Sequence, residues 1–310
     1  MSDSILVLGA GGFVGRHLVQ ALASRGEKVL AVSRRATAPE PAMPGIEHVL
    51  AATADPAWLL PLVARSRIVV HLASGSTPGS SAGQPLAELH GSLQLTLALL
   101  EALQQRPQTS LLYLSSGGSL YRATPDTVVD EGATVAPRSY HGAGKVAAEH
   151  FISAWCSQYA GAATIVRPSN LYGPGQLERA GFGIVPAGFG KMLRDETLVV
   201  WGDGSATRDY LFIDDFVALC TAILGAPMRE GALALNASSG VGVSLNELFT
   251  EMETVAGKVL LRTYDPGRAV DAARVVMDAA QARRLFGWTP GISLHEGLKR
   301  TWDRFTTIPR

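Results

Sequence analysis

The stretch nearest the N-terminus constrains this chain more than any other. An apolar run, Ile5 to Leu8, precedes the glycine-rich turn Gly9-Ala10-Gly11-Gly12-Phe13-Val14-Gly15, and residues 17–22 continue with apolar side chains at helical spacing. A short buried strand, a tight turn and a helix in this order are typical of a mononucleotide-binding unit, where backbone N–H groups at the helix N-terminus face a pyrophosphate. We therefore predict that this turn binds a dinucleotide.

Each glycine of the turn has its own physical reason. Gly9 permits the tight turn, Gly12 lets the backbone approach the phosphates because no Cβ intervenes, and Gly15 lets the helix pack closely on the strand. Phe13 and Val14 open the helix, so they belong to the same predicted cofactor site.

Further strands and helices alternate along the chain. We expect strands at 28–33, near 48–50, and at 68–73, 111–114 and 163–166, with long helices at 93–103 and from about 140 to 155. This alternation predicts right-handed βαβ units and therefore an α/β fold with a doubly wound parallel sheet. Ligands of such sheets bind at the carboxyl ends of the strands, which places Leu72 and Ala73 at the predicted cofactor site.

The end of the second predicted strand indicates which cofactor the site takes. An acidic residue there would accept hydrogen bonds from the adenosine ribose of NAD, whereas a guanidinium pairs with the 2′-phosphate of NADP. This chain has Ser33, Arg34 and Arg35 at that point. The sequence predicts NAD(P), and Arg34 favours NADP. The alternative is that both arginines are solvated loop charges.

Composition excludes several classes of protein. The 310 residues are 47% hydrophobic and carry 27 basic and 27 acidic side chains, so no net charge points to nucleic acid or an anionic membrane. Cys156 and Cys220 lack metal-ligand spacing, and we expect no metal site and two small buried hydrophobes. A strand beginning near Ile5 leaves no room for a signal peptide, and no apolar run is long enough for a bilayer. We expect a cytoplasmic protein.

The second half of the chain has a different character. Glycine and proline become frequent near Leu171 and the regular alternation weakens. We therefore divide the chain into a dinucleotide-binding domain, 1–170, and a smaller substrate-binding α/β region, 171–310, from which segments return to the first domain. Arg208 and Arg268 are candidates for binding a diphosphate through charge-assisted hydrogen bonds.

Several motifs together resemble the extended short-chain dehydrogenase/reductase family, in particular its nucleotide-sugar epimerases, dehydratases and 4-keto-reductases. The motifs are GAGGFVG, VVHLAS, LSSGGSLY, RPSNLYGPGQ, WGDGSATRDYLFIDD and MDAAQARRLFGWTPGISLHEGL, and they span nearly the whole chain. The resemblance implies a Rossmann domain that binds the nicotinamide cofactor and a C-terminal region that binds a nucleotide-diphosphate sugar. It implies that Asn170, Arg208 and Arg268 contact this substrate, and that the chain forms a homodimer through helices 93–103 and 145–155.

One further match concerns helix capping. Asp214 and Asp215 also fit the family's pattern. Their simplest role is to cap a helix that begins at Phe216, and we expect them to do so.

The catalytic residues depart from the family's pattern. The family places a tyrosine four residues before a lysine on one helix, so that the ammonium lowers the pKa of the phenol and contacts the nicotinamide ribose. Here His141 lies four residues before Lys145, and Tyr140 lies five before. At about 100° per residue, His141 lies within about 40° of Lys145 and Tyr140 some 140° away. Tyr140 could act only if the helix starts late or is distorted near Gly142 and Gly144.

The family's usual serine or threonine is also replaced, because its position falls on Gly117. Ser116 or Ser119 would then supply the missing hydroxyl. We expect His141 to replace the phenol, because an imidazole is suited to acid–base work near neutral pH and the Lys145 ammonium favours its neutral form. Since histidine is shorter than tyrosine, contact with a sugar hydroxyl could need a bridging water or a shift of the substrate.

Three functions remain open from the sequence. The first is a UDP-hexose 4-epimerase type of enzyme that retains NAD and moves a hydride at C4 of a nucleotide-diphosphate hexose. The second is an NADPH-dependent 4-keto-sugar reductase, which Arg34 favours. The third is a non-catalytic relative that binds NAD(P) or a sugar nucleotide, which Gly117 and His141 favour, and against which stand Lys145 and the two arginines.

Overall fold

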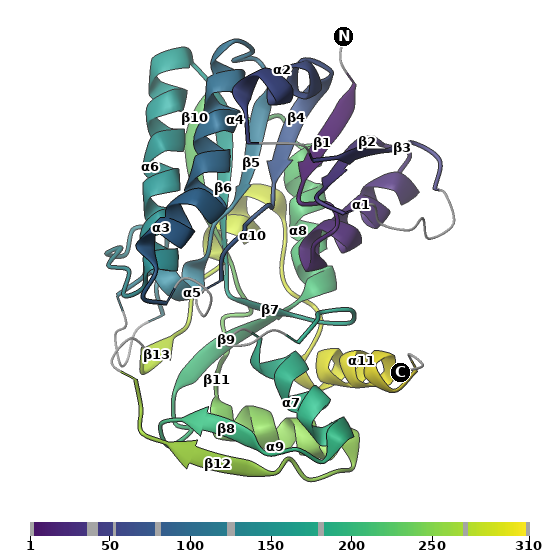
Figure 1. The fold of residues 1–310 in the computed structure, drawn as a ribbon, viewed down its shortest axis with the longest axis vertical. Helices are drawn as coiled ribbons and strands as arrows, with labels where there is room; N and C mark the ends of the chain where they lie inside the picture. Colours follow the sequence, from purple (N-terminus) through teal and green to yellow (C-terminus); the bar gives the residue numbers. More distant parts are fainter. Residues whose placement is uncertain are drawn as a thin grey trace. The chain divides into compact units, whose positions relative to one another are not determined.

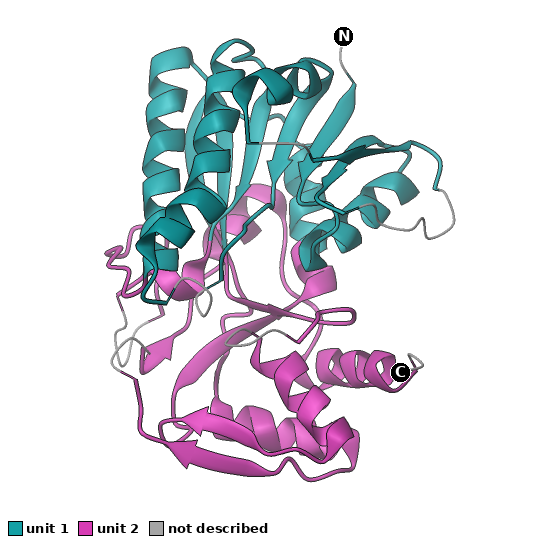
Figure 2. Cartoon of the chain, in the orientation of Figure 1, with its two compact units in different colours: residues 1–115, 140–167, 217–235 teal, residues 116–139, 168–216, 236–310 magenta. Residues whose placement is uncertain are grey.

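The computed structural model describes residues 3–35, 43–51, 54–77, 82–122, 128–178, 183–268 and 272–307. The chain forms two compact units, coloured separately in Figure 2. The first unit comprises residues 1–115, 140–167 and 217–235, and the second comprises 116–139, 168–216 and 236–310. The division of the sequence after residue 170 stays a prediction.

The first unit is built on a seven-stranded sheet in the order β10-β6-β5-β4-β1-β2-β3. The strands are β1 Ser4–Leu8, β2 Lys28–Ser33, β3 Ile46–Leu50, β4 Ser66–His71, β5 Ser110–Leu114, β6 Ala162–Pro168 and β10 Gly231–Ala237. Strand β1 pairs in parallel with β2 on one side and β4 on the other. The chain thus winds outward in both directions from β1, which confirms the predicted doubly wound α/β fold.

Helices cover this sheet (Figure 1). They are α1 Phe13–Ser24, α2 Pro56–Ala64, α3 Pro85–Glu88, the short π-helix η1 Leu89–Leu93, α4 Gln94–Gln104, α6 Tyr140–Tyr159 and α8 Ile213–Gly225. Helix α4 contacts both α2 and α6. Leu99, Leu103, Ile152 and Trp155 bury their side chains in the core formed with the strands, and this burial of apolar surface holds the helices on the sheet.

A buried ion pair fixes helix α6 to the ends of two strands. Glu149 of α6 accepts hydrogen bonds from Arg167 of β6, at 3.1 Å from Nε and 2.6 Å from Nη2, and from Ser115 Oγ at 2.5 Å. Both members of the ion pair are buried. Because Ser115 directly follows β5, this clamp sets the position of α6 relative to the carboxyl ends of β5 and β6.

The second unit contains two smaller sheets. In one, β9 pairs with β11, β13 and β7; the other joins β8 and β12. Its elements are α5 Gly117–Leu120, β7 Asn170–Tyr172, α7 Ile184–Arg194, β8 Leu198–Trp201, β9 Thr207–Phe212, β11 Gly242–Ser244, α9 Leu245–Ala256, β12 Arg262–Asp265, β13 Arg274–Val275, α10 Ala280–Phe286 and α11 Leu294–Thr307. The smaller α/β region predicted from the sequence is therefore present.

The predicted capping of α8 is wrong. The helix begins at Ile213, so Asp214 and Asp215 lie within its first turn rather than before it. The Asp215 carboxylate instead accepts hydrogen bonds from the backbone N–H groups of Gly291, at 3.0 Å, and Ile292, at 2.9 Å. The hydrogen-bond donors to Asp215 lie about 76 positions further along the chain. No local sequence pattern shows such a tertiary contact.

Both cysteines of the chain lie in its interior. Cys156 and Cys220 are free and buried, as predicted. Within the described ranges, every helix is too short or too polar to cross a bilayer.

The ion pair of Glu149 and Arg167 gives a prediction about stability. The change Glu149→Gln removes a negative charge that contacts the buried Arg167 guanidinium, so we expect the free energy of unfolding to fall by about 3 kcal/mol. Urea unfolding followed by circular dichroism measures it. The control is Glu47→Gln, which breaks the exposed ion pair between Glu47 and Arg65 and should leave unfolding almost unchanged. Equal effects of the two changes would contradict the assignment of the clamp.

Candidate functional site

The glycine-rich turn has the backbone geometry that the sequence predicts. Gly9 has φ +91°, and a Cβ at this position would lie 2.8 Å from the backbone nitrogen of Ala73. A Cβ at Gly15 would overlap the carbonyl oxygen of Gly9. Gly12 is exposed, and the only neighbour that its Cβ would meet within 4 Å among the described residues is the Gly9 oxygen, at 3.2 Å. The turn therefore brings backbone close together on one side and leaves Gly12 open on the other.

Helix α1 begins at Phe13 without a side chain to cap it. Its N-cap is Gly12, which makes no side-chain hydrogen bond, and its first turn carries no acidic residue. The first N–H groups, those of Phe13 and Val14, therefore meet neither a capping oxygen nor a negative side chain from their own turn. Such a helix N-terminus is suited to an anionic group, because the N–H groups and the helix dipole both favour negative charge.

The ends of β2 and β4 carry the other predicted cofactor residues. Leu72 donates its N–H to the Leu8 carbonyl at 2.9 Å, and Ala73 follows it directly beside Gly9. Ser33 donates from Oγ to the carbonyl of Arg35 at 2.7 Å. Arg34 is exposed. The structure thus brings Leu72 and Ala73 to the glycine turn.

Helix α6 orients the two candidate acid–base residues differently. It begins at Tyr140 and runs unbroken to Tyr159. Tyr140 is 48% exposed, whereas His141 is 7% exposed. The late start that would turn Tyr140 towards Lys145 is absent, and His141 and Lys145 are both buried on this helix.

Lys145 holds its ammonium in a site from which water is largely excluded. Nζ donates to the carbonyl of Leu114 at 2.7 Å and lies 4.9 Å from the centroid of the Tyr113 ring. Burial lowers the pKa of Lys145 to about 8, and the carboxylates of Glu88 and Glu149 oppose that fall.

The buried aromatic groups beside Lys145 do not titrate near neutral pH. His71 of β4 lies fully buried, and its Nε2 is 3.0 Å from Thr96 Oγ1. Burial, helped by the Lys145 charge, lowers the pKa of His71 to about 3. Burial also raises the pKa of the Tyr113 phenol. Both rings therefore stay neutral when Lys145 changes its charge.

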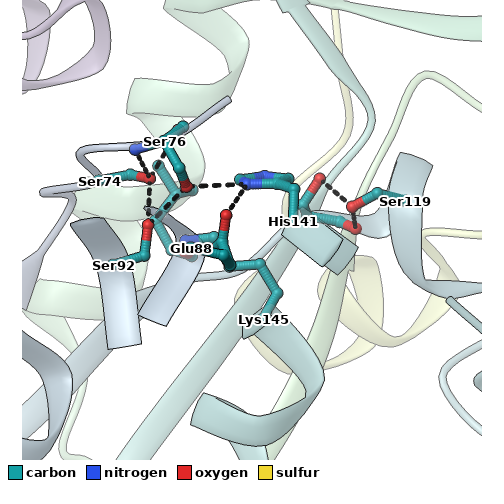
Figure 3. A network of polar contacts seen from close by, with 9 residues as sticks. Ser74, Ser76, Glu88, Ser92, Ser119, His141 and Lys145 are labelled. Carbon is teal, nitrogen blue, oxygen red and sulfur yellow. Dashed lines mark hydrogen bonds and ion pairs between the residues drawn. The ribbon is translucent and has the colours of Figure 1, made fainter. Parts of the chain in front are cut away.

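The imidazole of His141 meets two groups through the same nitrogen (Figure 3). Nδ1 lies 3.4 Å from Ser76 Oγ and 3.5 Å from Glu88 Oε2. Glu88, the last residue of α3, is only 3% exposed. It fits beside α6 because residue 144 is glycine: a Cβ there would lie 2.6 Å from Glu88 Cγ and 2.7 Å from Oε1.

A chain of serine hydroxyls continues from Ser76. Ser74 Oγ donates to the Ser76 carbonyl at 2.9 Å and lies 2.9 Å from Ser92 Oγ, which in turn lies 2.7 Å from Ser76 Oγ. A hydroxyl has one proton to donate. Since Ser74 uses its proton on the carbonyl, Ser92 donates to Ser74, and Ser76 donates to Ser92. Ser76 Oγ then accepts, so the His141 nitrogen that faces it carries a proton.

The serines after β5 belong to the second unit. Ser116 precedes α5, and Ser119 Oγ donates to Ser116, at 2.8 Å from its Oγ and 3.2 Å from its carbonyl oxygen. Gly117, which lies next to Ser116, is buried. The structure thus joins the two candidate hydroxyls to each other.

The candidates for substrate binding lie on or near β7 and β9 and after β12. Asn170 is exposed and donates from Nδ2 to the Asp209 carbonyl at 2.9 Å. Arg208, on β9, donates from Nη1 to the Thr207 carbonyl at 2.9 Å. Arg268 is exposed, and its guanidinium carbon lies 5.4 Å from the centroid of the Trp201 ring.

Glu88 and Ser76 contact His141 and Ser74 joins the chain of hydroxyls, although none of the three is a candidate site residue from the sequence. Ser74 ends the motif VVHLAS, Ser76 follows in the loop after β4, and Glu88 lies on a short helix outside the motifs. One signal was available, because a glycine inside a helix, here Gly144, often marks the close approach of another group. As for metals, the described residues contain no group of three or more histidine, cysteine, aspartate or glutamate side chains placed to bind one.

Comparison with known proteins gives consistent matches along the chain. The model of the "NAD dependent epimerase/dehydratase family" matches residues 5–236. A UDP-glucose 4-epimerase of Mycolicibacterium smegmatis is 31% identical over 308 residues, which cover 97% of each chain.

Two solved structures resemble this one over nearly their full length. UDP-glucose 4-epimerase from Thermotoga maritima, solved with UDP-glucose, is 27% identical with a TM-score of 0.90, over 98% of both chains. UDP-glucose 4-epimerase from Thermus thermophilus, solved with NAD, is 26% identical with a TM-score of 0.89, over 98% of this chain and 99% of that one.

The burial of Lys145 gives a prediction about its titration. In protein labelled with ¹⁵N at lysine side chains, we expect the Nζ signal of Lys145 to titrate near pH 8 because burial disfavours the ammonium. The variant Lys145→Met assigns the signal. In Glu88→Gln the titration should move to lower pH, because a carboxylate that supports the ammonium is gone. A Lys145 titration near the ordinary value of about 10.4 would contradict the description of this site.

Proposed function

The chain belongs to the NAD dependent epimerase/dehydratase family, and from this premise we propose that it is a nucleotide-sugar 4-epimerase of the UDP-hexose type that uses NAD(P). One observation carries the proposal. The loop after β4 contacts the glycine turn at Ala73 and the buried His141 at Ser76. Residues 73–76 thereby connect a glycine turn of the phosphate-binding type to a candidate acid–base group within the first unit.

The residues of the first unit fit a dinucleotide. Gly9, Gly12 and Gly15, with the N–H groups of Phe13 and Val14, would hold the pyrophosphate at the start of α1. Leu72 and Ala73 would line the site, and the Lys145 ammonium would donate to the ribose next to the nicotinamide. When bound, the nicotinamide supplies a reversible exchange of hydride with a sugar carbon.

His141 is proposed as the residue that moves the proton. Its neutral ring accepts the proton of the C4 hydroxyl as that carbon becomes a carbonyl, and returns the proton when the hydroxyl forms again on the opposite face. Lys145 follows four residues later on α6, and both side chains are buried. In this proposal His141 replaces the family's tyrosine, while the exposed Tyr140 takes no part in the chemistry.

The second unit is proposed to bind the sugar nucleotide. Asn170, Arg208 and Arg268 would contact it, and the two guanidinium groups would form charge-assisted hydrogen bonds with the diphosphate. Ser116 or Ser119 would supply a hydroxyl to the sugar. The homodimer and the cytoplasmic location stay predictions.

A second candidate is an NADPH-dependent 4-keto-sugar reductase, which the exposed Arg34 after β2 favours. A guanidinium there would pair with the 2′-phosphate of NADP. The two reactions differ in what happens to the cofactor. The epimerase regenerates its cofactor in each cycle, whereas the reductase consumes NADPH stoichiometrically.

The test compares UDP-galactose conversion by the wild type and two variants. We expect UDP-galactose to become UDP-glucose without net NADH formation, and His141→Phe to reduce kcat by about 10²- to 10⁴-fold because the proton acceptor is lost. Tyr140→Phe, which removes the neighbouring exposed phenol, is the matched control and should keep its turnover.

Other outcomes separate the rival proposals. NADPH consumption with a 4-keto sugar, in place of epimerisation, would establish the reductase. Binding of UDP-galactose without turnover under either condition would establish the non-catalytic relative. Full turnover in His141→Phe would remove His141 from the chemistry.

A further inference from the structure

We propose that Glu88 is a positioning residue that holds the His141 imidazole with its proton on Nδ1, so that Nε2 is the nitrogen that exchanges a proton with substrate. The inference deepens the proposed function and rests on it. The carboxylate is brought to the ring by the fold alone, since Glu88 and His141 are 53 positions apart and on different helices.

Electrostatics favours a proton on Nδ1. Glu88 Oε2 lies 3.5 Å from His141 Nδ1, and the two side chains are 4% and 8% exposed. A buried carboxylate at this distance attracts a proton on Nδ1, because an N–H dipole or an imidazolium there is stabilised in a medium of low dielectric constant. Orientation of an imidazole by a carboxylate on the far nitrogen is a general way to make the other nitrogen the base.

The serine hydroxyls favour the same tautomer independently. Each hydroxyl has one proton to donate. Ser74 donates to the Ser76 carbonyl, Ser92 to Ser74 and Ser76 to Ser92, so Ser76 Oγ acts as an acceptor towards His141. Nδ1 must then donate. Both neighbours of Nδ1 therefore require the same tautomer, and none of the contacts of His141 within the described residues uses Nε2.

Helix α6 leaves space for Glu88. The carboxylate occupies a notch in α6 that exists because residue 144 has no side chain, with Glu88 Cγ 2.6 Å from where a Cβ would be. A glycine within a helix is less favourable than alanine. Gly144, which forms the notch, lies between His141 and Lys145 in the sequence, so the Glu88 carboxylate interacts with both side chains. It raises the pKa of Lys145 against the effect of burial.

The ionisable groups of this part of the first unit come from four elements. On α6 these groups are Lys145 and Glu149, on α3 Glu88, on β4 His71 and on β5 Tyr113. Burial keeps His71 neutral above about pH 3, raises the pKa of Tyr113, and places the pKa of Lys145 at about 8. Around neutral pH, His71 and Tyr113 therefore keep their neutral form, whereas Lys145 changes its charge near pH 8.

The experiment changes Glu88 and reads the ring itself as well as the activity. In Glu88→Gln we expect the His141 ring, followed by NMR in the whole protein, to become protonated about one pH unit or more below wild type, because the imidazolium loses a nearby negative charge. The acid limb of the pH–rate profile should move with it. We expect kcat to fall at least about tenfold with little change in KM. Glu101→Gln, which removes an exposed carboxylate from neighbouring α4, is the matched control.

Two further variants separate positioning from a general loss of structure. Gly144→Ala fills the notch while keeping both charged groups and favouring the helix, and it should move the ring titration in the same direction. In a His141→Phe background, Glu88→Gln should lower kcat no further, because its partner is gone.

Each result decides a separate question. An unchanged ring titration in both Glu88→Gln and Gly144→Ala would overturn the inference, whatever the activity. A shifted ring titration in a protein that does not epimerise would keep Glu88 as the partner of His141 and overturn only the proposed function.

Discussion

The buried charge of Lys145 requires compensating groups, and its neighbours in the first unit provide them. Lys145 is only 6% exposed, and burying its ammonium group is costly unless acceptors and negative charges compensate for the lost water. The structure provides the Leu114 carbonyl, the face of Tyr113 and the carboxylates of Glu88 and Glu149. Compensation is incomplete, and the pKa of Lys145 settles near 8, so that the group is charged at neutral pH yet responsive to its neighbours. The two carboxylates then acquire second tasks: Glu149 clamps α6 to β6 through Arg167, and Glu88 faces His141.

The sequence predicted the parts of this arrangement that depend on local pattern. Residues 5–15 have a strand, a turn and a helix start that only small residues permit, so the roles of Gly9 and Gly15 follow from the order of the residues themselves. The spacing of His141 and Lys145 predicts that both lie on one face of a helix and that Tyr140 does not, because a helix advances by about 100° per residue. The structure has this arrangement, with α6 starting at Tyr140. The chemical roles of these residues stay predictions.

Tertiary contacts could not be predicted in the same way. Glu88 lies on a four-residue helix, and only the path of the chain after β4 brings it to His141. A distortion of the helix near Gly144 is a condition for Tyr140 to act, whereas the helix is regular and the glycine makes room for a carboxylate. Asp215, which the sequence predicts to cap a helix, instead accepts hydrogen bonds from the backbone of Gly291 and Ile292. In each case the residue type was visible, but its partner was distant in the sequence.

The proposed chemistry depends most directly on which nitrogen of His141 carries the proton. Long-range ¹H–¹⁵N correlation in protein labelled at histidine, assigned with His141→Phe, identifies the protonated nitrogen of the neutral ring. We expect a proton on Nδ1 and a bare Nε2, because a carboxylate and an accepting serine both face Nδ1. A neutral ring with its proton on Nε2 would contradict this arrangement.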